Sequence, residues 1–122
     1  MLIKTIKLKK ISNPKGNIFK MLSAKNKLFS GFGEIYFSEV FPSKFKGWKL
    51  HKNMSQVMTV ILGRVRFFIK YKKNKKIKKI DVGFPNNLKV IKIPKNCEYS
   101  FKCVGKTKAI IVNCTDKIYK QT

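Results

Sequence analysis

The chain has 122 residues, of which 29 are Lys or Arg and 5 are Asp or Glu, so its formal net charge is +24. This length allows one domain with a single core and excludes two. Hydrophobic residues make up 43% of the chain and aromatic residues 12%, a composition that excludes an intrinsically disordered protein. Since no apolar run approaches the ~18 residues of a membrane-spanning helix, a membrane is not an expected partner.

The excess of positive charge has two interpretations. A surface of this kind attracts anions, so a phosphate-bearing partner is the first expectation. Almost all of the cations are lysines spread along the chain, however, and lysines on a solvated face need not bind anything. Both interpretations remain open, because net charge bears on association rather than on fold.

The cysteines and the first residues indicate the compartment. Cys97, Cys103 and Cys114 are odd in number and lack a C-x-x-C spacing, which argues against a disulfide framework or a zinc knuckle. Reduced thiols in a cytosol are the simplest interpretation. Residues Met1–Lys9 alternate apolar residues with Lys, whereas a secretory signal peptide has a continuous apolar stretch. We therefore expect a cytoplasmic protein.

The dominant spacing of apolar residues is two, and no long window shows the helical spacing with caps. A tight hairpin turn is expected at Gly63-Arg64, and a second, very basic turn at Lys72–Lys76. About ten short strands separated by turn signals predict an all-β sandwich or barrel, in one domain over residues 1–122. The expected strands are Leu2–Leu8, Ile18–Leu22, Glu34–Phe41, Lys44–His51, Gln56–Leu62, Val65–Tyr71, Ile77–Val82, Leu88–Ile93, Tyr99–Val104 and Ala109–Val112.

The stretch Lys46–Gly63 is the expected functional site. It contains the only histidine, His51, and the only tryptophan, and it leads into the apolar run Val57–Leu62. A buried strand is a rigid mount for polar residues placed just before it. His51 has an ordinary pKa of ~6.5 and is the best available base. Lys49, two residues earlier on a strand, is expected to face the same side.

The spacing of this stretch matches a known motif. Lys49-Leu50-His51, four residues, Gln56, six residues and Gly63 reproduce the cupin spacing H-x-H-x4-E-x6-G. Tyr99 stands where the second cupin motif has its histidine. Of the four metal-binding positions only His51 offers a usual ligand, whereas a stable site needs three or more. We therefore expect no metal, and no other cofactor.

Longer segments resemble the RmlC-like cupins that act on nucleotide-linked 4-keto-6-deoxy sugars. This resemblance implies a jelly-roll cupin barrel, also called a double-stranded β-helix, and a dTDP-linked sugar as substrate or ligand. It also implies a homodimer with the N-terminal strands at the interface, and a place in deoxysugar and surface-polysaccharide biosynthesis, such as that of lipopolysaccharide. The segments are Gly33–Val40, Lys46–Lys52, Ile93–Phe101 and Asn113–Asp116, so the similarity spans most of the chain.

Two branches of these cupins are relevant. In the dTDP-4-dehydrorhamnose 3,5-epimerases, the base histidine falls on Lys49, the enolate-steadying lysine on Gln56 and the proton-donating tyrosine on Val112. In the dTDP-4-oxo-6-deoxyglucose 3,4-ketoisomerases, H-A-H-K and a following Gln resemble Lys49–Lys52 and Gln56, and only the first histidine is changed. The resemblance therefore favours the ketoisomerase over the epimerase.

Both reactions remove a proton beside the 4-keto group and create an enolate. The site then needs a base, a cation or donor for the developing oxyanion, and positive charge for the diphosphate. His51 is the expected base, Lys49 the expected cation at the enolate oxygen, and Tyr99 the expected second acid. Guanidinium groups match phosphate oxygens well. The expected substrate-binding residues are Lys46, Gln56, Arg64 and Arg66.

Two other functions stay open. Because several catalytic positions differ from both branches, the chain could be a catalytically silent cupin that binds a nucleotide sugar or acts as an assembly partner. The charge of +24 also fits a nucleic-acid-binding protein, whose affinity would fall steeply with salt. Nucleic acid is the least favoured partner, since no exposed strand face is recognised on which basic and aromatic residues interleave. The lysines of residues 72–79 are expected to form a solvated hairpin.

Overall fold

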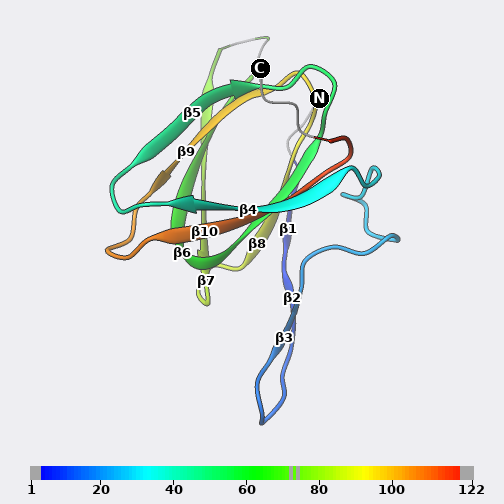
Figure 1. Cartoon of the computed structure of the whole chain (residues 1–122), viewed down its shortest axis with the longest axis vertical. Coiled ribbons are helices and arrows are strands. Elements are labelled where there is room, and N and C mark those ends of the chain that lie inside the picture. The colour runs from blue at the N-terminus through cyan, green and yellow to red at the C-terminus, as the bar shows by residue number, and fades with distance from the viewer. Residues whose placement is uncertain (1–3, 72, 74, 119–122) are drawn as a thin grey trace.

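The computed structural model describes residues 4–71, 73 and 75–118 (Figure 1). No helix occurs in this part of the chain, so none is present there that could cross a membrane. The all-β prediction is confirmed. The ten strands are β1 (Lys4–Lys7), β2 (Lys9–Ile11), β3 (Ile18–Lys20), β4 (Glu34–Val40), β5 (Phe45–Leu50), β6 (Gln56–Lys70), β7 (Ile77–Phe84), β8 (Lys89–Ile93), β9 (Glu98–Cys103) and β10 (Ala109–Thr115).

Strand β6 is shared by two antiparallel sheets. Residues 56–62 pair with β10 on one side, and residues 56–58 pair with β8 on the other; this first sheet continues to β4 and β1. Residues 63–70 pair with β7, and residues 65–70 also pair with β9, which in turn pairs with β5. The two sheets enclose the interior of a jelly-roll barrel (Figure 1).

The hairpin turn predicted at Gly63-Arg64 is wrong, because β6 runs without interruption through both residues. Gly63 has a φ of +77°, and a Cβ atom there would lie 2.7 Å from the carbonyl oxygen of Lys108. Glycine is thus needed for a left-handed backbone and a close approach, at the point where β6 passes between the sheets. A composition that resembles a turn therefore marks a bend within one strand.

The turn that ends β6 lies in the basic segment, as predicted. The backbone N–H of Tyr71 donates to the carbonyl of Lys76 at 3.1 Å, and that of Lys75 donates to the carbonyl of Tyr71 at 2.9 Å. Lys72 and Asn74 of this turn lie outside the described residues, as do Leu2 and Ile3 of the first predicted strand. The second predicted strand is shorter than expected, since β3 ends at Lys20.

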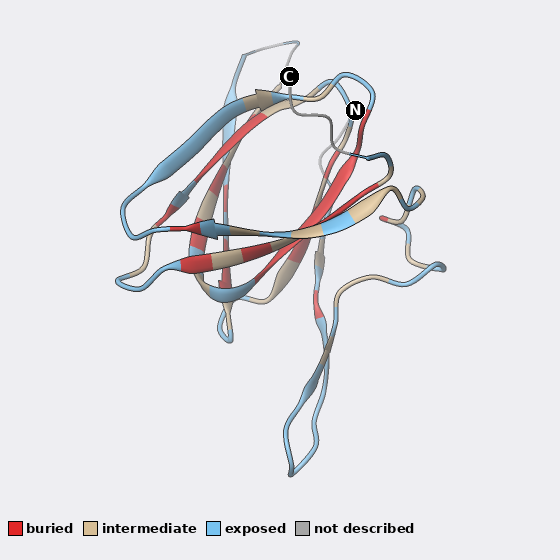
Figure 2. Cartoon of the chain, in the orientation of Figure 1, coloured by how far each residue is buried: buried red, intermediate tan, exposed pale blue. Residues whose placement is uncertain are grey.

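Alternation along the strands separates a buried face from an outer face. In the second half of β6, Val65, Phe67 and Ile69 are fully buried, whereas the residues between them are partly or well exposed. These buried residues belong to the main apolar core, and the buried positions lie along the strands of the barrel (Figure 2). A smaller apolar cluster, which includes Leu28 and Val57, packs outside the first sheet beneath the N-terminal segments. The β2–β3 hairpin projects away from the barrel as an exposed arm (Figures 1 and 2).

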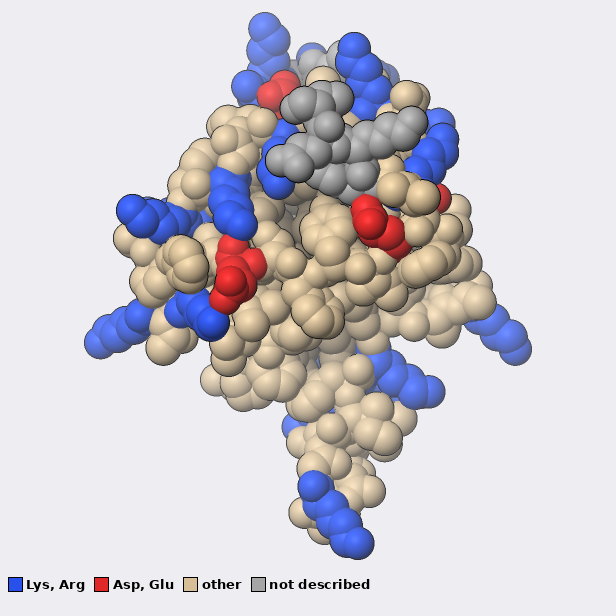
Figure 3. Space-filling model, viewed as in Figure 1, with Lys and Arg blue, Asp and Glu red and all other residues tan. Residues whose placement is uncertain are grey.

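The positive charge lies on the surface, where lysine and arginine side chains project around the edge of the view in Figure 3. Two ion pairs occur within the described residues, Arg66 with Asp81 at 2.7 Å and Lys108 with Glu39 at 2.8 Å. The formal net charge of +24 already counts all Asp and Glu residues, so these ion pairs leave it unchanged. The surface thus keeps the strong attraction for anions that the composition predicts.

Replacing Gly63 by Ala is expected to lower the free energy of unfolding by roughly 2–5 kcal/mol, because the new Cβ is strained at this φ and meets the Lys108 carbonyl. Urea denaturation measures this loss. The matched control is Gly16→Ala, at a φ of +133° with no atom within 4 Å of the added Cβ, so its loss should be clearly smaller. Equal losses would show that the approach to Lys108 is unimportant.

Candidate functional site

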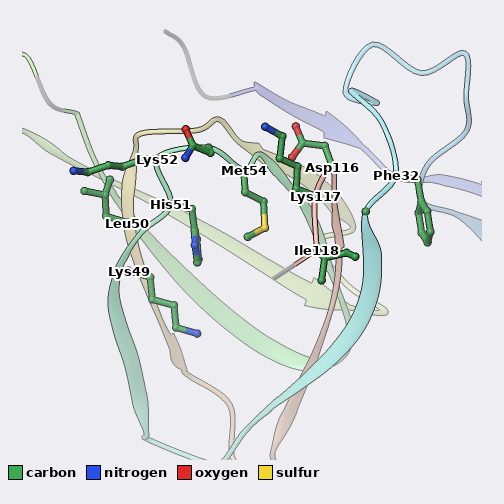
Figure 4. Close-up of a pocket in the computed structure, with 11 residues that line it drawn as sticks. Phe32, Lys49, Leu50, His51, Lys52, Met54, Asp116, Lys117 and Ile118 are labelled. Carbon is green, nitrogen blue, oxygen red and sulfur yellow. The ribbon is translucent and has the colours of Figure 1, made fainter. Parts of the chain in front are cut away.

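A cavity of about 910 Å³ opens at one end of the barrel. Three segments that are distant in sequence line it: residues 32–33 before β4, residues 49–54 at the end of β5 and after it, and residues 116–118 after β10. Figure 4 shows Lys49 and His51 directed into the same space, with Ile118 across from them and Met54 beside His51. The cavity therefore contains the histidine and the lysine that the sequence singles out.

Strand pairing holds Lys49 in place. Lys49 is opposite Tyr99 in the β5–β9 pair, and its Nζ lies 5.9 Å from the ring centroid of Phe101 on the inner face. The ring of His51, one residue beyond β5, has its centroid 6.2 Å from that of Tyr99. The two candidate groups thus enter from adjacent positions on one wall.

Lys46 reaches the same side of β5 because the strand is irregular. The pairing register shifts between Lys46 and Lys49, which places the two lysines on one face although they are three residues apart. The Lys46 ammonium donates to the hydroxyl of Ser38 on β4 at 3.2 Å. Two positive groups therefore lie near one another on the inner side of β5.

This arrangement changes the acid–base properties of the cavity. Burial lowers the pKa of Lys49 below its usual value, and the positive charge of Lys46 adds to the effect. Burial also lowers the pKa of His51 below 6.5, and here the charge of Lys49 contributes. His51 is therefore neutral at neutral pH, as a general base must be, beside an ammonium that can stabilise an anion.

Tyr99 and Gln56 belong to a buried polar network. The Tyr99 hydroxyl donates to Gln56 Oε1 at 2.9 Å, and the Asn113 amide donates to the same oxygen at 2.6 Å and to the Tyr36 hydroxyl at 2.9 Å. Tyr99 is 2% exposed and Gln56 1%, and neither lines the cavity. Tyr99 can deliver a proton to a ligand only after its hydroxyl leaves Gln56.

Arg64 and Arg66 do not reach the cavity. They precede and follow the buried residue Val65 on β6, and Arg66 is itself followed by the buried residue Phe67, so the alternation of the strand turns both arginines to the outer face. Arg66 binds Asp81 there through Nε and Nη2, at 2.7 and 3.1 Å. Neither arginine lines the cavity, so the geometry gives no support to their predicted role as diphosphate ligands.

The network and the cavity wall contain residues that sequence reasoning missed. Asn113 was overlooked because the expected last strand ends at Val112, whereas β10 continues to Thr115. Asp116 accepts a hydrogen bond from the backbone N–H of Ser55 at 2.9 Å, which ties the segment after β10 to the segment before β6. Lys117 and Ile118 then follow on the wall opposite His51 (Figure 4). Asn113 and Asp116 belong to the segment Asn113–Asp116, whose resemblance to the family was the available signal, whereas Lys117 and Ile118 carry no recognisable signal.

The donor set is not that of a metal centre. Among the described residues, no group of three or more His, Cys, Asp or Glu side chains lies close enough together to hold a metal ion. The cavity wall instead carries lysines and a histidine, and an ammonium repels a divalent cation. The arrangement is suited to binding an anionic organic ligand and to moving a proton.

Neither a protein-family model nor a curated protein matches this chain, but solved structures do. A dTDP sugar isomerase from Desulfovibrio desulfuricans is 33% identical with a TM-score of 0.90, and the match covers 98% of this chain and 79% of that chain. The sugar 3,4-ketoisomerase QdtA from Thermoanaerobacterium thermosaccharolyticum, in complex with TDP, is 17% identical with a TM-score of 0.80, covering 97% and 82%.

A third structure comes from the epimerase branch. The dTDP-6-deoxy-D-glucose-3,5-epimerase RmlC from Legionella pneumophila, in complex with dTDP-4-keto-L-rhamnose, is 15% identical with a TM-score of 0.82, and the match covers 97% of this chain and 68% of that chain. At this identity, the second and third structures show the jelly-roll fold alone. The identity and coverage of the first structure show more: the chain belongs to the RmlC-like family of dTDP-sugar isomerases and epimerases.

Proposed function

We propose that this protein isomerises a dTDP-4-keto-6-deoxy sugar, moving the keto group from C4 to C3, in deoxysugar and surface-polysaccharide biosynthesis. The observation that carries the proposal is the pair formed by His51 and Lys49 in one cavity, a neutral imidazole beside an ammonium. Further support comes from a QdtA variant of 18% identity, solved in complex with TDP-4-keto-6-deoxyglucose.

The chemistry follows from this pair. His51 accepts the proton from C3, and the electrons of the broken C–H bond move into the 4-keto group and give an enolate. The Lys49 ammonium lies on the same wall and stabilises the negative charge on that oxygen. The proton of the 3-hydroxyl then passes to the enolate oxygen at C4, and His51 returns its proton to C4. C4 becomes a secondary alcohol and C3 the ketone, so the protons balance. One base serves both carbons because C3 and C4 are adjacent.

Epimerisation at C3 and C5 fits the site less well. It requires protons to leave and return on opposite faces of the ring, so a second acid must stand across from the base. The resemblance aligns the tyrosine of the epimerases with Val112, and this residue lies outside the barrel in a hollow lined by N-terminal residues. Tyr99 remains the candidate second acid, but it is held by Gln56 on the same side as His51.

We assign the diphosphate to lysines instead of the two arginines. Lys46 lies near Lys49 on the inner side of β5, and Lys117 lines the opposite wall of the cavity. Burial lowers the pKa of Lys49, and repulsion from Lys46 adds to this effect. A dianionic diphosphate beside these lysines offsets the repulsion. Gln56 is buried and does not line the cavity, so we assign it an indirect role in which its amide oxygen holds the Tyr99 hydroxyl.

Incubating the protein with dTDP-4-keto-6-deoxyglucose in heavy water tests the proposal. We expect NMR to show deuterium replacing the C3 proton and a 3-keto product accumulating. Deuterium at both C3 and C5, with inversion of configuration at these carbons, would show that the protein is an epimerase and not a ketoisomerase. Binding of the nucleotide sugar with no exchange at either carbon would overturn the enzymatic proposal in favour of a silent cupin.

We also propose that the protein is a cytoplasmic homodimer. Ile35 and Phe37 on the outer face of β4 are 55% and 69% exposed, and Ile18 on the projecting arm is 54% exposed. Apolar surface of this kind is typical of subunit interfaces. Light scattering should give about twice the chain mass of 14.2 kDa, and a single-chain mass at high concentration would contradict the dimer. Three unpaired cysteines fit a reducing cytoplasm.

A further inference from the structure

The outer face of the sheet formed by β5, β9, β6 and β7 carries aromatic and basic side chains side by side. We call it the basic–aromatic face and define it by Phe45 and Trp48 of β5, Phe68 and Lys70 of β6, and Lys102 of β9. Trp48 precedes Lys49 and faces the opposite way, so this face lies on the other side of β5 from the cavity. Phe45 is 49% exposed and Trp48 is 41% exposed.

Contacts between strands hold these side chains together. The rings of Phe45 and Phe68 have centroids 6.2 Å apart, and the Lys70 ammonium lies 5.5 Å from the ring centroid of Trp48. The expectation from the sequence concerned single strand faces, whereas here the aromatic and basic residues lie side by side on neighbouring strands. Strand β6 itself presents Arg64, Arg66, Phe68 and Lys70 on this side, and β5 adds the other two aromatic rings.

The face ends in a small hollow. A cavity of about 340 Å³ adjoins Lys70 and is lined by Leu50, Lys70, Tyr71, Lys75, Asn96 and Glu98. It lies beyond the Trp48–Lys70 contact, since Lys70 pairs with Glu98 and Glu98 pairs with Leu50. A volume of this order accommodates a small planar ligand. Two carboxylates belong to the face, Glu98 in this hollow and Asp81, which Arg66 already binds.

We propose that the basic–aromatic face binds single-stranded nucleic acid, with bases stacked on its aromatic rings and phosphates beside its lysines. Residues two apart on a strand are about 6.7 Å apart, so successive rows of the sheet can contact successive nucleotides of an extended strand. Stacking tolerates any base, because each has a π-face. Double-stranded nucleic acid hides its base faces and cannot use the rings. The charge of +24 supplies the complementary field.

A chain this basic attracts any polyanion at low salt, so the test must separate the contribution of the aromatic rings from that of net charge. Fluorescence anisotropy would compare oligo(U), oligo(dT) and a duplex, each about 12 nucleotides long, at about 50 and 200 mM salt. We expect both single strands to bind more tightly than the duplex and to quench Trp48, the only tryptophan. Comparing oligo(U) with oligo(dT) shows whether the face prefers RNA or DNA. Equal affinity for the duplex would overturn the proposal, as would binding without quenching.

Matched variants locate the site. Phe45→Ser with Phe68→Ser should weaken single-strand binding by roughly 10-fold to 100-fold and leave duplex binding unchanged. The double variant Lys70→Gln with Lys102→Gln should weaken single-strand binding more than the control Lys9→Gln with Lys10→Gln. The control removes the same charge from β2, on the projecting arm. If the two pairs of lysine substitutions lower the affinity equally, the effect is due to net charge alone, and the proposal is overturned. All variants should keep dTDP-sugar turnover, which checks folding and is independent of this face.

Discussion

Replacing His51 by Asn is expected to lower the rate of C3 proton exchange by a factor of about 10² to 10⁴, the usual contribution of a positioned general base. Asparagine keeps a polar side chain of similar size at the end of β5 but has no nitrogen that accepts a proton at neutral pH. Affinity for dTDP should remain close to that of the unchanged protein, because His51 acts on the sugar rather than on the phosphates.

The comparison needs both readouts, NMR-detected exchange for the chemical step and calorimetric titration with dTDP for binding. Adding free imidazole provides a further check, since a small base that enters the cavity of about 910 Å³ should restore part of the lost exchange. A merely structural histidine predicts a different pattern, in which thermal stability and dTDP affinity fall together and imidazole restores nothing. Unchanged exchange in the variant would remove His51 from the mechanism.

The pairing of His51 with Lys49 could be predicted from the sequence because it depends on a local rule. Side chains two apart on a strand share a face, and the strand was recognisable from its alternation. Lys46 obeys no such rule: it joins the same face only because the β5–β9 register shifts between Lys46 and Lys49. A shift of this kind depends on the partner strand, so a single sequence does not predict it.

The arginines illustrate a different error. Val65, Phe67 and Ile69 alternate with Arg64 and Arg66, and this pattern alone predicts that the arginines face away from the barrel interior. The preference of guanidinium for phosphate outweighed that pattern in assigning them to the site. Burial imposes the stricter constraint, because moving an arginine inwards would shift Val65 and Phe67 out of the core.

Gly63 and the cavity wall could not be inferred in the same way. A glycine between two apolar runs is common to a hairpin turn and to a strand that bends between sheets, and only the pairing of residues 63–70 with β7 decides between them. The segment 116–118 reaches the cavity after β10 has crossed the barrel. Long-range pairing sets both features, whereas local alternation sets the positions of His51 and Lys49.

Replacing Lys49 by Met is expected to lower kcat by a factor of about 10² to 10³, as removal of one oxyanion donor does in other enzymes. The pH profile should change as well. In the unchanged protein kcat/KM falls as the pH drops through the lowered pKa of His51, below 6.5. Without the charge of Lys49 the pKa of His51 rises, so this acid limb moves to higher pH. The basic limb due to Lys49, below pH 10.5, should disappear.

Lys52→Met is the matched control, since Lys52 also borders the cavity but its side chain points away from Lys49 (Figure 4). It removes one charge of the same kind, so a general electrostatic effect on the nucleotide would appear in KM in both variants. Only Lys49→Met should lower kcat strongly and move the acid limb, because only this ammonium lies beside both the base and the developing enolate. An acid limb that moves equally in the two variants would mean that the pKa of His51 responds to the total charge of the cavity, and Lys49 would lose its specific role.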